Sequence, residues 1–222
     1  MASYFILGAG TFGRLALRRL PDEDPEARLL VIDRKAAALA EARTLGVEGA
    51  ERLETDVIAY LAKHLEPGFP WDWLIPAIPV HVACAWLLAG PLAGGGWETA
   101  EVPESLDQLA PLAIRGREGE LYLSRARHRC PDDCAEPLVC PVTGEERGQP
   151  LFETITEASR PELPILVVAS RQLAPGVGGY SPLRLLELAE TVAAMSGPLL
   201  VATACRCHGV VHGLRRTGER PA

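Results

Sequence analysis

The first ninety residues alternate between two spacings of apolar side chains. Short apolar runs bounded by polar or turn residues predict strands, and apolar positions recurring every three or four residues predict helices. Strands are expected at 4–7, 28–33, 47–53 and 73–77, and helices at 11–20, 35–45, 56–64 and 80–89. Helices of this length between strands produce right-handed crossovers, so the pattern predicts a parallel sheet of the α/β class.

A second alternation follows a break in the pattern. Residues 91–119 are rich in Gly, Pro and Glu and predict a connection between two halves. Beyond it we expect strands at 120–125, 164–170 and 199–203, helices at 151–159 and 182–195, and a long loop at 128–148. The prediction is one Rossmann-like, doubly wound parallel sheet, with residues 1–90 as its first half and 120–214 as a second β-α-β-α-β half. The basic stretch 215–222 predicts a disordered tail.

Composition narrows the class of partner. The chain has 222 residues, of which 48% are hydrophobic, and this is enough for a sizeable core. Its net charge of −7 argues against a nucleic-acid surface, which needs clustered Lys and Arg. We therefore expect a small molecule as ligand, with a protein partner or a homo-oligomer as further options. The opening MASYFILGAG lacks a basic region before its apolar run, so it predicts a first strand rather than a signal peptide, and a cytoplasmic protein.

Residues 74–97 are apolar over a length that could cross a bilayer. Apart from the thiol of Cys84, His81 is the only ionisable side chain among them. Three prolines and the run Gly94, Gly95, Gly96 interrupt the stretch, and a buried strand followed by a buried helix has the same composition. We therefore predict no membrane span.

The string GAGTFG directly follows a predicted strand and opens a predicted helix. In this context Gly8 permits a tight turn, Gly10 lets backbone amides approach a pyrophosphate, and Gly13 lets the helix pack closely on the sheet. Thr11 and Phe12 complete the turn, and the helix amino terminus supplies partial positive charge. The pattern predicts a dinucleotide site, against the alternative of glycines used only for the turn.

Asp33 ends the second predicted strand, in VIDRK, where a carboxylate can accept hydrogen bonds from both ribose hydroxyls. A 2′-phosphate would be repelled by this carboxylate, so NAD is favoured over NADP. Arg34 and Lys35 weaken the preference, because either could reach a phosphate.

The segments ILGAGTFGRLALRRL and VIDRKAAALAEARTLGV, with the later Asp56, resemble the TrkA-N domain, the NAD-binding module of potassium-transport regulators and related dehydrogenase-like proteins. The resemblance covers about the first ninety residues. It implies nucleotide binding at Gly8, Gly10, Gly13 and Asp33, and does not imply potassium regulation. The chain lacks an evident regulatory carboxy-terminal domain of that family and adds a cysteine-rich second half.

Five of the six cysteines lie in the second half, at Cys130, Cys134, Cys140, Cys205 and Cys207. In a cytosolic protein, grouped cysteines more often bind metal than form disulfides. The first three lie in one loop, and Cys205, Cys207 or His208 could complete a ligand shell, with His128 and His212 in reserve. Their spacing matches no standard zinc ribbon or ferredoxin run, so space-filling thiols or a redox pair remain alternatives.

Zinc and an iron–sulfur cluster both suit this set. A histidine ligand favours zinc, while the surplus of thiols favours a cluster, toward which we lean. Cys84, within a predicted apolar helix, is interpreted as a small buried hydrophobe.

Other candidates lie at the carboxyl ends of predicted strands, where doubly wound sheets bind ligands. His81 follows the fourth strand and could be a general acid or base beside the nicotinamide, or simply a histidine satisfied by backbone groups. Arg171 opens the glycine-rich loop SRQLAPGVGGYSP, whose amides could bind an anionic group with it, or whose glycines could serve only the turn.

The leading hypothesis is an NAD-binding, metal-containing redox protein, oxidoreductase-like and of unassigned substrate. A nucleotide-sensing regulatory module with a structural zinc is the first alternative. A metal-assisted hydrolase or transferase that uses a nucleotide is the second.

Overall fold

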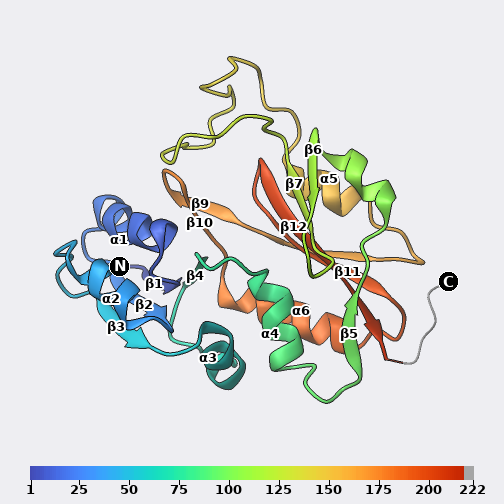
Figure 1. The fold of residues 1–222 in the computed structure, drawn as a ribbon, viewed down its shortest axis with the longest axis horizontal. Helices are drawn as coiled ribbons and strands as arrows, with labels where there is room; N and C mark the ends of the chain where they lie inside the picture. Colours follow the sequence, from blue (N-terminus) through green and yellow to red (C-terminus); the bar gives the residue numbers. More distant parts are fainter. Residues whose placement is uncertain (218–222) are drawn as a thin grey trace.

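A computed structural model describes residues 1–217 and confirms the α/β class (Figure 1). The first half contains β1 (Ser3–Leu7), α1 (Thr11–Glu23), β2 (Arg28–Asp33), α2 (Ala36–Arg43), β3 (Glu51–Glu54), α3 (Val57–His64) and β4 (Trp73–Pro76). Its four strands are all parallel, in the order β3-β2-β1-β4. This is the Rossmann-like sheet that the sequence predicts.

Both faces of this sheet are covered, as continuous apolar strands require. Phe5 and Leu7 of β1 point into one core cluster with α3, and Tyr4 and Ile6 point into another with α1 and α2. The side chain of Asp56 begins α3 by accepting a hydrogen bond from the amide of Ala59, at 2.9 Å. The predicted N-cap of this helix is therefore confirmed.

The second half of the structure, which begins at residue 82 rather than at the predicted residue 120, forms a sheet of its own. It contains α4 (Val82–Ala89), β5 (Trp97–Ala100), the 3-10 helix η1 (Glu104–Leu109), β6 (Leu112–Arg115), β7 (Leu121–Ser124), α5 (Leu151–Glu157), β8 (Ile165–Ala169), β9 (Arg171–Ala174), β10 (Val177–Gly179), α6 (Pro182–Ala193), β11 (Leu199–Ala204) and β12 (His208–Arg216). The strand order is β6-β7-β12-β11-β8, and β5 also pairs with β12.

This second sheet corrects the expectation of one continuous parallel sheet. Only β8 and β11 are parallel, while β12 is antiparallel to β11, β7 and β5. The sequence prediction ended the strands at 203 and therefore missed β12, which lies at the centre of the sheet. It also took 91–119 as a bare connection, where the chain forms β5, η1 and β6.

Two glycines explain why the sequence pattern does not predict β12. Gly209 and Gly213 lower the strand propensity of HGVVHGLRR, yet both are required by crowding from neighbouring strands. A Cβ atom on Gly213 would lie 2.5 Å from the carbonyl oxygen of Ala100 in β5, and one on Gly209 would lie 2.9 Å from the Cβ of Ala204. The absence of a side chain at these two positions lets the backbone of β12 lie close to β5 and β11.

The glycine-rich segment after β8 forms a hairpin, where the sequence pattern predicts a loop. Strands β9 and β10 pair antiparallel, with Gly176 in the turn at a φ of 70°. Just beyond β10, Tyr180 forms two backbone hydrogen bonds with Leu74 of β4, at 2.9 and 3.1 Å. The hairpin therefore joins the second half to the edge of the first sheet.

Helices also bridge the two sheets. In Figure 1 the first sheet lies on the left and the second on the right, with α4 and α6 in the lower part between them. Leu199 and Val201 of β11 share one core cluster with Phe5 of the first sheet and Trp86 of α4. On the opposite face, Leu200 packs in a cluster with α5 and η1. The two halves thus share a single large core.

Two other predictions concern a membrane span and the carboxy-terminal tail. Within residues 1–217 no helix combines the length and apolar character needed to cross a membrane, and 74–97 divide between β4, α4 and β5. Arg215 and Arg216 belong to β12 and pair with Glu98 and Trp97, so the strand extends into the predicted tail. Residues 218–222 of that tail lie outside the described residues.

The crowding around Gly213 yields a test. Gly213→Ala should lower the free energy of unfolding by about 1–3 kcal/mol, because its methyl group would force β5 away from β12. Gly197→Ala is the control, since no atom lies within 4 Å of its added Cβ. Urea denaturation of both variants measures the difference, and equal midpoints would contradict the crowded packing.

Candidate functional site

The glycine turn after β1 has the shape that the sequence predicts. Gly8 has a φ of 113°, and a Cβ atom there would lie 2.8 Å from the carbonyl oxygen of Ala77. A Cβ on Gly13 would overlap the carbonyl oxygen of Gly8. Gly10 differs, since no atom lies within 4 Å of its added Cβ. Gly8 and Gly13 are therefore required by packing, while Gly10 faces open space.

Asp33 holds this turn in place. One carboxylate oxygen accepts a hydrogen bond from the amide of Ala9, and the other accepts from the amide of Lys35, both at 2.8 Å. A carboxylate offers about four lone-pair positions, so Asp33 keeps capacity for a ribose hydroxyl. Thr11, Phe12 and Arg34 are exposed around the turn, and the Phe12 ring is 60% exposed.

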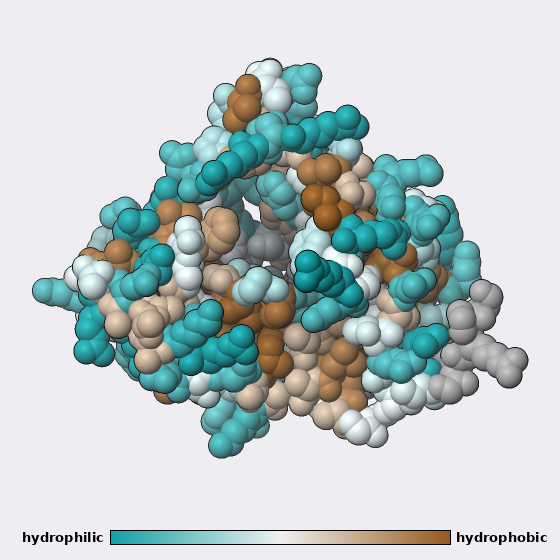
Figure 2. Space-filling view, in the orientation of Figure 1, coloured by the Kyte–Doolittle hydropathy of each residue, from teal (hydrophilic) through white to brown (hydrophobic). Residues whose placement is uncertain are grey.

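A cavity of about 520 Å³ lies between the turn and the cysteines of the second half. We call it the cysteine cavity. Figure 2 shows the surface hollowed between the loop at the top and the two halves below. Its walls include Phe12 and Pro76 from the first half, and Cys130, Cys134, Glu136, Arg147, Cys205, Cys207 and His208 from the second. The structure thus brings four of the five clustered cysteines to the edge of the glycine turn.

One group within the cysteine cavity has donor atoms close enough to share a metal ion. These atoms of Glu136, Cys205 and His208 all lie within 4.8 Å of one another. The sulfur of Cys130 lies 3.8 Å from Nε2 of His208. The sulfur of Cys205 also accepts contacts from the backbone amides of Cys207 and His208, at 3.5 and 3.4 Å. Such amides stabilise negative charge on sulfur.

Arg147 places a positive charge among the sulfur atoms. Its guanidinium donates to the sulfur of Cys207 at 2.8 Å and to that of Cys134 at 3.2 Å. Burial raises the pKa of both Cys130 and Cys207, and Arg147 opposes the rise in each. Burial, followed by the charge of Glu136, raises the pKa of Cys205 to about 12. A bound metal ion would oppose this rise by favouring the thiolate form of Cys205.

Cys140 lies apart from the rest of the predicted ligand set. It lines an adjoining cavity of about 420 Å³, to which Cys130, Arg147 and Cys207 also contribute. Its sulfur lies 3.8 Å from Nε2 of His128. Backbone amides of Thr143 and Val142 lower the pKa of Cys140 to about 6, which favours the thiolate form of this half-buried side chain.

The loop 128–148, which we call the cysteine loop, is anchored to the first half. Arg19 of α1 donates hydrogen bonds to the carbonyl oxygens of Asp132, at 2.6 Å, and Pro175, at 2.5 Å. The carbonyl of Cys134 accepts from the amide of Gly176 at 3.1 Å and from the side-chain nitrogen of Gln172 at 2.7 Å. The hairpin β9–β10 thus carries the loop over the cavity.

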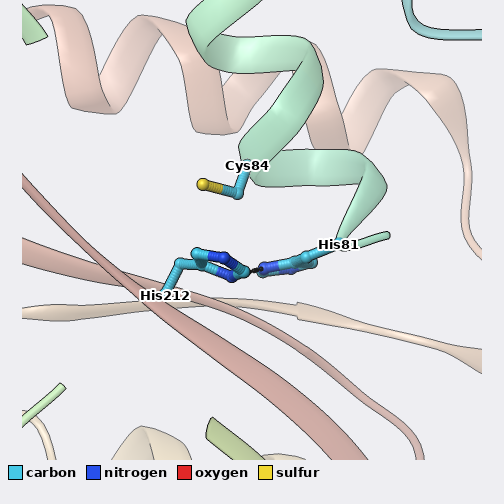
Figure 3. A group of neighbouring side chains, drawn as sticks. All are labelled: His81, Cys84 and His212. Atoms are coloured by element: carbon cyan, nitrogen blue, oxygen red, sulfur yellow. Dashed lines mark hydrogen bonds between the residues drawn. The ribbon is translucent and has the colours of Figure 1, made fainter. Parts of the chain in front are cut away.

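The two predicted catalytic residues lie elsewhere. Arg171 is exposed at the start of β9 and lines neither cysteine-bearing cavity. His81 is 5% exposed, at the start of α4, and its Nδ1 lies 3.0 Å from Nδ1 of His212. Cys84 completes this buried group (Figure 3). Donor atoms of the three residues lie within 4.8 Å of one another, so they form a possible His/Cys metal site.

Both histidines of this group are held neutral. Burial, followed by the neighbouring His212, lowers the pKa of His81 to about 3, and burial also lowers the pKa of His212. Neutral imidazole is the form that binds metals. Burial raises the pKa of Cys84 to about 12.

Sequence reasoning missed several residues of these groups. Glu136 and Arg147 lie in a loop whose fold the sequence does not indicate. The spacing of His81 and Cys84 does carry a signal, since residues three apart share a helix face. Their partner His212, over a hundred positions away, could not be assigned without the strand pairing of β12.

Comparison with known proteins places the chain among relatives whose function is open. A family model, AF_1314_C, described as "Uncharacterized protein, C-terminal domain", matches residues 72–217. An "Uncharacterized protein" of Archaeoglobus fulgidus is 29% identical over 228 residues, which cover 95% of this chain and 98% of the relative. No solved structure matches. The matched family region contains the cysteines of the cavity and the His81 group, and it begins after the glycine turn and after Phe12.

The contact between Gly176 and the cysteine loop can be tested. Gly176→Ala should expose 128–148 to protease, because the added methyl would overlap the carbonyl oxygen of Asp132. Gly46→Ala is a matched control, with a similar φ of 67° but no atom within 4 Å. Limited proteolysis compares them. Equal resistance of the loop in both variants would show that the hairpin does not hold it.

Proposed function

The chain belongs to the AF_1314_C family, and we propose that it is a dinucleotide-dependent redox protein with a metal centre in the cysteine cavity. One observation carries the proposal. The same cavity is lined by Phe12, next to the glycine turn, and by the donor group of Glu136, Cys205 and His208. A nucleotide on the turn and a metal on these donors would therefore lie at the same cavity, close enough for a redox reaction between the nucleotide and a reactant at the metal.

The glycine turn fits a dinucleotide. Open space at Gly10 leaves room for phosphate oxygens at the amino terminus of α1, where helix amides favour an anion. Asp33 is positioned by Ala9 and Lys35 to accept from a ribose hydroxyl. Its negative charge supports NAD over NADP. A bound nicotinamide would supply hydride transfer, and the side chains at the far end of the cavity would hold the second reactant.

The donor group fits a mononuclear metal. Thiolate, imidazole and carboxylate together suit zinc, and three protein donors with one side open are typical of catalytic zinc sites. Cys130 is near enough to His208 to serve as a fourth donor. An iron–sulfur cluster would instead use Cys130, Cys134, Cys205 and Cys207, all of which line the cavity. The assembled carboxylate and imidazole favour zinc, which reverses the preference drawn from composition.

Anchoring of the loop favours a second candidate, a nucleotide sensor with a structural metal. Arg19 lies on the helix whose amino terminus would bind the nucleotide, and it holds the loop that carries Cys134. Binding at the turn could therefore change the order of the loop without turnover. Anaerobic assay of NADH oxidation against small carbonyl compounds and artificial electron acceptors distinguishes the two. Oxidation supports the redox protein, and NADH affinity with no oxidation supports the sensor.

Nucleotide binding at the turn is tested with Gly10→Asp. The carboxylate would occupy the space for the pyrophosphate and repel it, so NADH affinity should fall by at least tenfold, about 1.4 kcal/mol. Gly197→Asp adds the same charge at another open position, between α6 and β11. Isothermal titration with NADH measures both. Equal affinity in the two folded variants would refute the nucleotide site.

Metal binding in the cysteine cavity is tested with Cys205→Ser. Protein purified without oxygen should lose its bound metal in this variant, because the serine hydroxyl is a poor substitute for a thiolate. Cys140→Ser should keep the metal, since Cys140 lines only the adjoining cavity. Elemental analysis measures the loss, and brown colour would identify a cluster in place of zinc. Full occupancy in Cys205→Ser would refute the assigned ligands.

A further inference from the structure

The group formed by His81, Cys84 and His212 lies inside the largest core cluster, away from the cysteine cavity. Their exposed fractions are 5%, 2% and 7%. His81 begins α4 and Cys84 follows three residues later on the same helix face. His212 comes from β12, opposite Val201 of β11, a member of that core cluster. Figure 3 shows the two imidazoles edge to edge, with the thiol of Cys84 beside them.

We propose that these three residues form a second, closed metal site for one d10 ion that prefers thiolate and imidazole, copper(I) or zinc(II). The site is independent of the metal centre proposed for the cysteine cavity, with which it shares no residue. Two imidazole nitrogens and one sulfur are the donors that soft and borderline transition metals select.

The distances fit such an ion after a small adjustment. The two Nδ1 atoms are 3.0 Å apart, joined by a proton that one ring donates to the other. Metal–nitrogen bonds of about 2.0–2.1 Å place two nitrogen ligands roughly 3.4 Å apart in tetrahedral geometry. Replacing the shared proton by a metal ion therefore requires the rings to separate by a few tenths of an ångström. All donor atoms already lie within 4.8 Å of one another.

Two imidazoles and a thiol meet at this point of the core. Burial of polar side chains is unfavourable unless their polar atoms find partners, and most core positions therefore have apolar residues. The neighbours Val82, Trp86 and Val201 of the core cluster are apolar. Three ligand-type side chains converging among such neighbours are better explained by an ion than by packing.

Charge separates the two candidate ions. Copper(I) with the thiolate of Cys84 and two neutral imidazoles has no net charge, whereas zinc(II) leaves one positive charge in the core. Burial of a net charge is unfavourable and favours copper(I), while the negative charges of Glu118 and Glu120, which act on His212, offset part of this cost for zinc(II). Three donors without a fourth among the described residues also fit copper(I) better, because zinc prefers four. A bound ion would fasten α4 to the central strand of the second sheet.

The test uses the full chain carrying Cys205→Ser, which removes a donor from the cysteine cavity. Metal-free protein is titrated anaerobically with copper(I) and, separately, with zinc(II). We expect one equivalent of one ion to bind, to raise the thermal unfolding midpoint, and to show one sulfur and two nitrogen neighbours by X-ray absorption. Adding Cys84→Ser or His212→Gln should abolish that equivalent and the rise in midpoint. Adding Cys140→Ser is the control, and it should change neither the bound equivalent nor the rise in the unfolding midpoint.

The outcomes are decisive for either ion. Copper(I) or zinc(II) bound with the expected neighbours supports the site and identifies its metal. Binding of neither ion, or the same equivalent bound after Cys84→Ser and His212→Gln, overturns it. If a double variant fails to fold, the X-ray absorption of the Cys205→Ser protein still decides, because a metal with several sulfur neighbours cannot lie in this group. A negative result would leave the cysteine cavity proposal standing.

Discussion

The backbone pairing between Leu74 and Tyr180 is the interaction on which the arrangement of the two halves depends. Through it the hairpin β9–β10 is fixed to the edge strand of the first sheet, although the hairpin follows β8 of the second sheet with only Ser170 between them. The hairpin in turn supports the cysteine loop through Gly176 and Gln172. Together with the hydrogen bonds from Arg19 of α1, this pairing fixes the position of the cysteines relative to the glycine turn and so defines the cavity between them.

Local chemistry made the first half predictable. Strand β2 agrees with its predicted limits of 28–33, and Asp56 begins its helix as expected, because apolar runs and capping residues act over a few positions. The strands of the second half depend on contacts between residues that are far apart in the sequence. Gly213 reads as a strand breaker until the carbonyl of Ala100 is seen beside it, and the glycine-rich segment after β8 reads as a loop until β4 gives it a partner.

Some residues of the candidate sites were likewise predictable from the sequence, and others were not. Clustering in the sequence was enough to single out the cysteines, and the fold gathers four of the five in one cavity. It was not enough to find Arg147, whose charge lies between two of their sulfur atoms, or to separate Cys140 from them. His81 was selected for its place at a strand end, yet its side chain points into the core toward His212. The strand pattern predicts where the backbone of a residue lies, but the direction of its side chain depends on packing.

The central place of β12 has a consequence for how the protein is made. This strand pairs with β5, β7 and β11, and all three precede it along the chain. All four strands of the first sheet have been made once residue 76 has been added, whereas the second sheet lacks its central strand until residue 216 has been added. Until then β7 and β11 expose unpaired edges that attract other strands. Synthesis therefore passes through a stage in which every strand of the first sheet is present while the second sheet still lacks the strand that joins its two sides.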